Sequence, residues 1–237
     1  MSWDILLIFF VLGVVVPWRG RKRLQQLVAK PRVEPGERLS LYWSTITFQW
    51  IAAVVVAWRA WAHGLTAQQL GLVMPRRLWL MLITVCGGVV IVTLQWLNLR
   101  RMGRSTSPLR GPIQALAERI LPRSTREFVP FLALAVTAGL CEEFLYRGFA
   151  MAVIARTGLP TGVVILVSSI LFGLAHLYQG RAGFVSTMVL GFLFGISRAA
   201  FGSLAPVIVW HAGVDVVAGI AGPRYLLVNR DVARISA

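Results

Sequence analysis

The chain has 237 residues, of which 57% are hydrophobic and only 14% charged, and its mean hydropathy is +0.72. Soluble domains usually carry about 25% charged residues. The composition therefore excludes a soluble globular protein, and the twelve Phe and nine Trp exclude a disordered chain. The net charge of +15 comes mainly from two polar stretches, 19–38 and 100–126, that separate apolar segments. We expect these basic residues to contact anionic lipid headgroups, and we expect no nucleic acid partner.

Seven apolar segments approach the length of about 20 residues that a helix needs to cross a hydrocarbon core of about 30 Å. They predict an all-α, polytopic membrane protein with about seven transmembrane helices, and six or eight are the alternatives. In chain order the segments are Trp3–Trp18, Leu39–Trp58, Leu78–Leu99, Phe128–Ala155, Pro160–Tyr178, Gly183–Ala200 and Leu204–Ala221. The first segment is the shortest, and its loss would move only the N-terminus to the other side of the membrane.

The distribution of Lys and Arg between the connecting segments predicts the orientation of the chain. If the N-terminus lies outside, the inner segments hold eighteen basic residues and the outer segments hold five. Because short cytoplasmic connections are enriched in Lys and Arg, this asymmetry predicts a multi-pass protein of the cell membrane with a cytoplasmic C-terminus.

Ionisable side chains inside apolar segments cost at least about 2.5–3.5 kcal/mol each, so a functional role is their first interpretation. Here they occur late in the chain, in three short patterns. The patterns are Glu142-Glu143-x-x-x-Arg147 in the fourth segment, Phe172-x-x-x-His176 in the fifth and His211-x-x-x-Asp215 in the seventh. Residues four apart share one face of a helix, so Glu143 can pair with Arg147. Glu142 is turned by about 100° and is free to face the bundle interior.

In this order, each in its own hydrophobic helix, the three patterns resemble the motifs of the CPBP, or ABI, family of CAAX-protease and bacteriocin-processing intramembrane peptidases. The resemblance implies a CAAX prenyl protease-like endopeptidase that hydrolyses a peptide bond near the cytoplasmic membrane face. Its substrate would be a membrane-associated peptide or protein, lipidated ones included. The chain then divides into N-terminal helices with basic cytoplasmic loops (1–127), a catalytic helical core (128–222) and a short basic cytoplasmic tail (223–237).

Within this resemblance, four residues are the expected catalytic residues. Glu142 would act as general base on a water molecule, His176 would position that water, and His211 would stabilise the tetrahedral oxyanion. Asp215 stands where the family usually has asparagine, and an ionised carboxylate cannot donate a hydrogen bond to an oxyanion. Asp215 would therefore either orient His211 or act directly.

Three further residues are expected to support the site. Glu143 and Arg147 would form an ion pair that fixes the rotation of their helix and neutralises an arginine that could not otherwise stay buried. Phe172 would form an apolar wall beside the imidazole of His176.

The same residues leave alternatives for the chemistry and the function. Glu142, His176 and His211 could bind zinc, which in catalytic sites takes three protein ligands and a water. A metal-free reaction without a cofactor is favoured, because the chain has no His-Glu-x-x-His motif. The alternatives to a protease are a non-catalytic self-immunity or scaffold protein of the same fold and a proton-coupled transporter. A transporter with inverted repeats would carry buried charges in both halves, and the first half lacks them.

Overall fold

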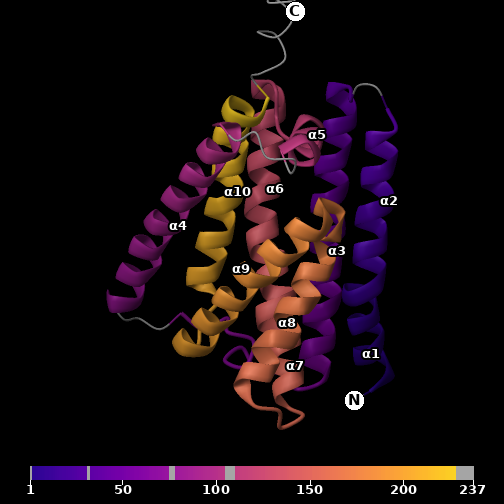
Figure 1. Ribbon diagram of the computed structural model, residues 1–237. Coiled ribbons are helices and arrows are strands. Elements are labelled where there is room, and N and C mark those ends of the chain that lie inside the picture. The colour runs from indigo at the N-terminus through magenta and orange to yellow at the C-terminus, as the bar shows by residue number, and fades with distance from the viewer. Residues whose placement is uncertain (1, 31–32, 75–77, 105–109, 228–237) are drawn as a thin grey trace, which may run out of the picture.

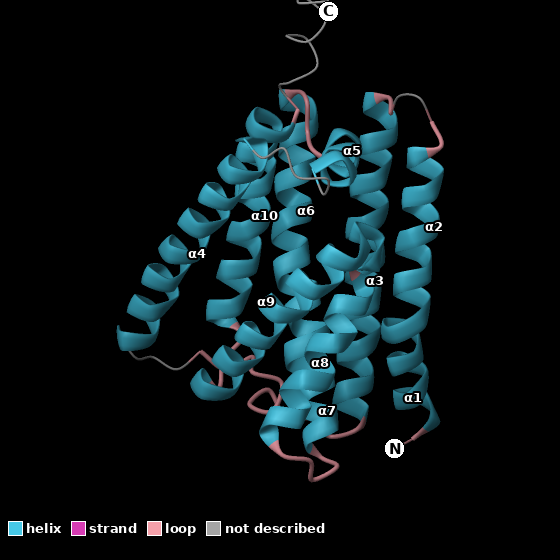
Figure 2. Ribbon diagram, in the orientation of Figure 1, coloured by secondary structure: helices cyan, strands magenta, loops and turns pink. Residues whose placement is uncertain are grey.

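The computed structural model describes residues 2–30, 33–74, 78–104 and 110–227, and every regular element within these ranges is a helix (Figure 2). The predicted all-α fold is therefore confirmed. The helices are α1 (Trp3–Phe10), α2 (Val16–Val28), α3 (Pro35–Ala62), α4 (Leu78–Arg104), α5 (Arg110–Ile120), α6 (Thr125–Glu143), α7 (Met151–Ala155), α8 (Thr161–Ala175), α9 (Gly180–Phe201) and α10 (Ala205–Leu226). π-Helical segments, Val11–Val15 and Phe144–Ala150, join α1 to α2 and α6 to α7 into two continuous rods.

Six helical segments are long and apolar enough to cross a membrane, which confirms a polytopic membrane protein. They are Trp3–Val28, Pro35–Ala62, Leu78–Arg104, Thr125–Ala155, Leu177–Phe201 and Ala205–Leu226. The remaining predicted span, Pro160–Tyr178, corresponds to the shorter α8, which ends at Ala175. The chain leaves the helix at His176 and reverses at Gly180, whose φ of 82° glycine adopts without a steric penalty.

The long helices stand side by side, and α1 begins at one end of the bundle while α10 finishes at the other (Figure 1). α3 packs along α6, and α10 packs against both α6 and α4. α8 and α9 form a tilted pair that reaches only part of the way up the bundle from the end where α1 begins. The C-terminal end of α8 therefore lies inside the bundle, next to α2, and carries His176 there.

Ion pairs join the first helices to the rest of the bundle. Arg38 Nε donates to Glu127 Oε1 over 2.9 Å and links α3 to α6, with both side chains buried. The carboxylate of Glu127 neutralises the buried guanidinium group of Arg38. The contact of the other basic residues with lipid headgroups stays a prediction. Asp4 Oδ2 accepts hydrogen bonds from Arg59 at 2.8 and 2.5 Å, which links α1 to α3 at the opposite end.

The polar connection between α4 and α6 contains α5, which docks on the end of α2. Arg119 donates to the carbonyl oxygens of Leu27 over 3.0 Å and of Val28 over 3.2 Å. The basic tail predicted for 223–237 lies outside the described residues from 228 onward, while α10 continues to Leu226. The division of the remaining chain at residue 127 stays a prediction.

Candidate active site

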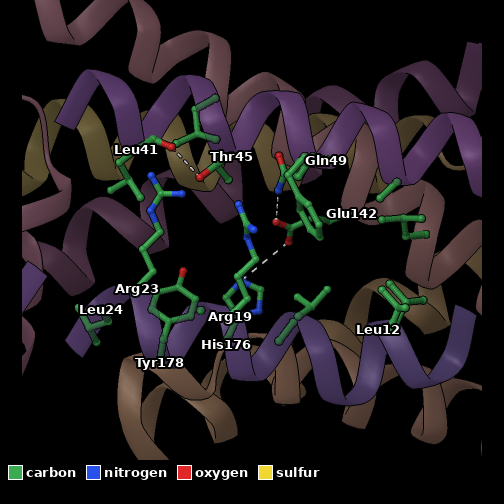
Figure 3. Close-up of a pocket in the computed structure, with 18 of the residues that line it drawn as sticks. Leu12, Arg19, Arg23, Leu24, Leu41, Thr45, Gln49, Glu142, His176 and Tyr178 are labelled. Atoms are coloured by element: carbon green, nitrogen blue, oxygen red, sulfur yellow. Dashed lines mark hydrogen bonds and ion pairs between the residues drawn. The ribbon is translucent and has the colours of Figure 1, made fainter. Parts of the chain in front are cut away.

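A cavity of about 240 Å³ lies between the α1–α2 rod, α3, α6 and the end of α8 (Figure 3). Its walls are largely apolar. The polar side chains that line it are Arg19, Arg23, Thr45, Gln49, Glu142, Tyr146, His176 and Tyr178. Two of the four predicted catalytic residues, Glu142 and His176, thus face one cavity although they belong to different helices.

Glu142, in the last turn of α6, lies where three helices meet. Its Oε2 atom is 3.8 Å from Nε2 of His176 and 3.9 Å from Nε2 of His211 on α10. This oxygen is buried and has no hydrogen-bond partner among the described residues. The structure therefore brings one carboxylate oxygen and two imidazole nitrogens together, while the catalytic roles of these residues stay predictions.

Glu143 holds the ring of His211. Nδ1 of His211 lies 2.7 Å from Glu143 Oε1, and because a carboxylate only accepts, Nδ1 is the donor. The other ring nitrogen, Nε2, therefore faces Glu142, and it also lies 3.7 Å from Asp215 Oδ2. Glu143 thus contacts the nitrogen that orients the ring, and Asp215 stands beside the nitrogen that faces the site.

The expected ion pair between Glu143 and Arg147 is present and fully buried. Arg147 Nη1 donates over 2.9 Å to the same Oε1 atom of Glu143 that accepts from His211. The guanidinium group also lies 4.0 Å from the centre of the Phe172 ring, in a cation–π contact. Besides neutralising the arginine, the pair supplies the carboxylate that orients His211.

Phe172 is the apolar centre of the site. Its ring centre lies 4.6 Å from that of His176 and 5.8 Å from that of His211. Nδ1 of His176 lies 2.9 Å from the backbone carbonyl oxygen of Phe172, which only accepts, so Nδ1 is the donor. In a neutral imidazole the other nitrogen is then an acceptor. His176 therefore presents an acceptor, Nε2, to the carboxylate of Glu142.

The spacing of these side chains does not fit a tetrahedral zinc site. Bonds of about 2.0–2.2 Å from zinc to nitrogen and oxygen place the ligand atoms about 3.3–3.6 Å apart. Glu142 Oε2 is 3.8 and 3.9 Å from the two imidazole nitrogens. In the described part of the chain, no group of three or more His, Cys, Asp or Glu side chains has the spacing of metal ligands.

Gln49 is a site residue that the sequence analysis missed. From α3, its Nε2 atom donates to Glu142 Oε1 over 2.6 Å (Figure 3). Its amide carries no charge, so a search for ionisable residues passes over it, and 93 positions separate the two residues. A polar side chain inside the apolar segment Leu39–Trp58 is the signal that could have indicated it.

Gly191 on α9 leaves the room that the buried Arg147 side chain occupies. A Cβ atom at this position would lie 2.6 Å from Arg147 Nη2 and 3.1 Å from Phe172 Cδ1. We expect Gly191→Ala to lower the free energy of unfolding by about 1–3 kcal/mol, because neither neighbour can move without disturbing the core. Thermal unfolding of the purified protein measures this loss.

The control is Gly162→Ala on α8, where a Cβ atom would meet nothing within 4 Å. This substitution should leave the stability unchanged or raise it by up to about 1 kcal/mol, because alanine favours the helix. Equal effects of the two substitutions would contradict the packing of Gly191 against Arg147.

The fold and the site define the class of the protein as a multi-pass membrane protein that holds a carboxylate and two imidazoles at one point inside its helical bundle. Residues 124–217 match the family described as "Rce1-like: Type II CAAX prenyl endopeptidase Rce1-like". This segment contains all seven predicted site residues, and its match supports the predicted resemblance to the CPBP, or CAAX protease, family of intramembrane endopeptidases. No curated protein and no solved structure matches the chain.

Proposed function

We propose that the protein is a metal-free intramembrane endopeptidase in which Glu142 activates a water molecule. The observation that carries this proposal is the pair of atoms Glu142 Oε2 and His176 Nε2, 3.8 Å apart. Both are acceptors when Nδ1 of His176 donates to its backbone partner. Two facing acceptors need a donor between them, and a water molecule can donate to both.

The reaction then follows from the positions of the three side chains. Glu142 takes a proton from the water, whose oxygen attacks the carbonyl carbon of the peptide bond. In its doubly protonated form, His211 donates from Nε2 to the oxyanion that forms, while Glu143 holds Nδ1. Glu142 returns the proton to the leaving nitrogen as the carbon–nitrogen bond breaks. Asp215, beside His211 Nε2, is proposed to orient the ring.

The cavity supports a membrane-associated substrate. Apolar side chains form most of its walls, and on α2 these alternate with Arg19 and Arg23. The guanidinium group of Arg19 lies 4.8 Å above the ring of Phe48 and makes no ion pair within the described residues. A peptide that carries apolar side chains or a lipid group would be accommodated by the apolar walls, and the arginines would attract anionic lipid headgroups.

A cleavage assay tests the proposal. The purified protein in lipid nanodiscs is given a set of membrane-associated peptides with and without a prenyl group, and mass spectrometry identifies the products. We expect cleavage at one defined bond, no stoichiometric zinc in the protein and no loss of rate with a chelator. Stoichiometric zinc that is lost together with activity in His176→Ala and His211→Ala would contradict the metal-free mechanism. If no peptide is cleaved, a non-catalytic scaffold is favoured. If the protein transports a solute and the Glu142→Gln variant still does so, a transporter is favoured.

We also propose that the reaction occurs on the cytoplasmic side of the membrane, because the cavity that contains Glu142 extends to Arg23 and Leu27 at the end of the bundle that carries the basic stretches. A reporter fused after Ala237 and one inserted between 104 and 110 should both report a cytoplasmic position, because most Lys and Arg lie on that side. An external signal from either reporter would reverse the orientation and the position of the cavity with it.

A further inference from the structure

α3 carries one amide side chain to the candidate general base. Gln49 is only 8% exposed, and the hydrogen bond of 2.6 Å from its Nε2 to Oε1 is the only one that the Glu142 side chain makes within the described residues. The two imidazole contacts of Glu142 involve its other oxygen and are too long, at 3.8 and 3.9 Å, to be direct hydrogen bonds. Gln49 lies outside the segment 124–217 that matches the family.

The chemistry of the partner determines the orientation of this amide. A carboxylate only accepts, so the NH₂ group of Gln49 faces Glu142. Its Oε1 atom is buried and has no hydrogen-bond partner in the described part of the chain. The hydrogen bond to Glu142 is therefore the interaction that accounts for a glutamine at this position.

Packing between α3 and α6 fixes the level of Gln49 along the bundle. Arg38, Tyr42 and Gln49 belong to one buried stripe on α3, with spacings of four and seven residues. Arg38 is paired with Glu127 at the start of α6, and the Tyr42 ring packs edge-on against an α6 ring at 5.6 Å. Because α6 also carries Glu142, both anchors hold the amide at a defined place relative to the carboxylate.

We propose that Gln49 is the positioning residue of the general base: its amide holds Oε1 of Glu142 so that Oε2 faces the two histidines and the attacking water. This inference rests on the proposed function of Glu142. Without the amide, the carboxylate can rotate about the bonds of its side chain and turn Oε2 away, which lowers the fraction of molecules ready for proton transfer. Gln49 acts through Glu142 and does not touch the substrate.

The test compares kcat and KM of three Gln49 variants on a peptide that the wild type cleaves. Gln49→Met keeps the length but removes the donor. It should lower kcat about 10- to 100-fold, the loss expected for one hydrogen bond to a charged group, and leave KM within about two-fold. Gln49→His keeps an N–H donor at similar reach and should recover part of the loss. Gln49→Glu keeps the shape of glutamine but sets a carboxylate against Glu142, so its kcat should be no higher than that of Gln49→Met.

The Gln49→Met variant separates positioning from packing, because a side chain that only filled space would be replaced best by an apolar side chain of similar length. Gln95→Met on α4, the same substitution at a half-buried position away from the cavity, should leave kcat unchanged. Wild-type kcat in Gln49→Met, or a Gln49→Glu variant more active than Gln49→His, would overturn the positioning role of Gln49. Either result would leave the proposed function of Glu142 intact. If Gln49→Met does not fold, the comparison of Gln49→His with Gln49→Glu decides. A wild type that cleaves no peptide would overturn the proposed function and this inference together.

Discussion

Glu142→Gln is expected to lower the rate of peptide cleavage by about 10²–10⁴-fold, the range for loss of a general base, without lowering the amount of folded protein. Glutamine has the shape of glutamate, but its amide cannot take a proton from water. The carbonyl oxygen of the new side chain can still accept the hydrogen bond from Gln49, so the contact between α3 and α6 is preserved. Mass spectrometry of the cleavage products gives the rate, and thermal unfolding gives the stability.

Asp215→Asn is the matched control, since it also exchanges a carboxylate for an amide next to His211 Nε2. Turnover should be retained or raised, because the amide can donate to an oxyanion and is the residue that the family usually has. A loss in Asp215→Asn as large as that in Glu142→Gln would make Asp215 an essential carboxylate. A loss of abundance in Glu142→Gln would make Glu142 a structural residue instead.

Arg147→Ala is expected to have the largest effect on stability, about 3–5 kcal/mol, which is the range for removing one partner of a buried ion pair. Both side chains of the pair are fully buried, so Glu143 would be left without its neutralising cation. The cation–π contact with Phe172 and the packing of the long side chain are lost as well. A lower yield of folded protein and a lower midpoint of thermal unfolding measure the effect.

Two controls separate burial from charge. Lys30→Ala removes the cation of the exposed Lys30–Glu37 pair and should cost less than about 1 kcal/mol. The double variant Glu143→Gln/Arg147→Met removes both charges and should recover much of the stability, but not the activity, because His211 loses the carboxylate that orients it. Equal losses in Arg147→Ala and Lys30→Ala would contradict a buried, uncompensated carboxylate as the cause.

The sequence by itself determined the features that depend on local spacing. Apolar segments of near-membrane length predicted the helices of the bundle, because a helix that crosses lipid must satisfy its backbone internally and present apolar side chains. The i,i+4 spacing predicted the Glu143–Arg147 pair, since residues four apart share a face whatever the surroundings. The rotation of about 100° between neighbouring residues likewise left Glu142 to face a different partner.

Only the tertiary structure decided which side chains from different helices meet. Gln49 contacts Glu142 across 93 positions, and His211 contacts Glu143 across 68. Local spacing pairs Glu143 with Arg147 only, and it does not indicate that Glu143 also orients the imidazole ring of His211. The early end of α8 also depends on the chain reversal after His176, which sets the imidazole inside the bundle. These contacts depend on the rotation and level of each helix against its neighbours. Packing of the whole bundle sets both, and no single segment of the sequence encodes them.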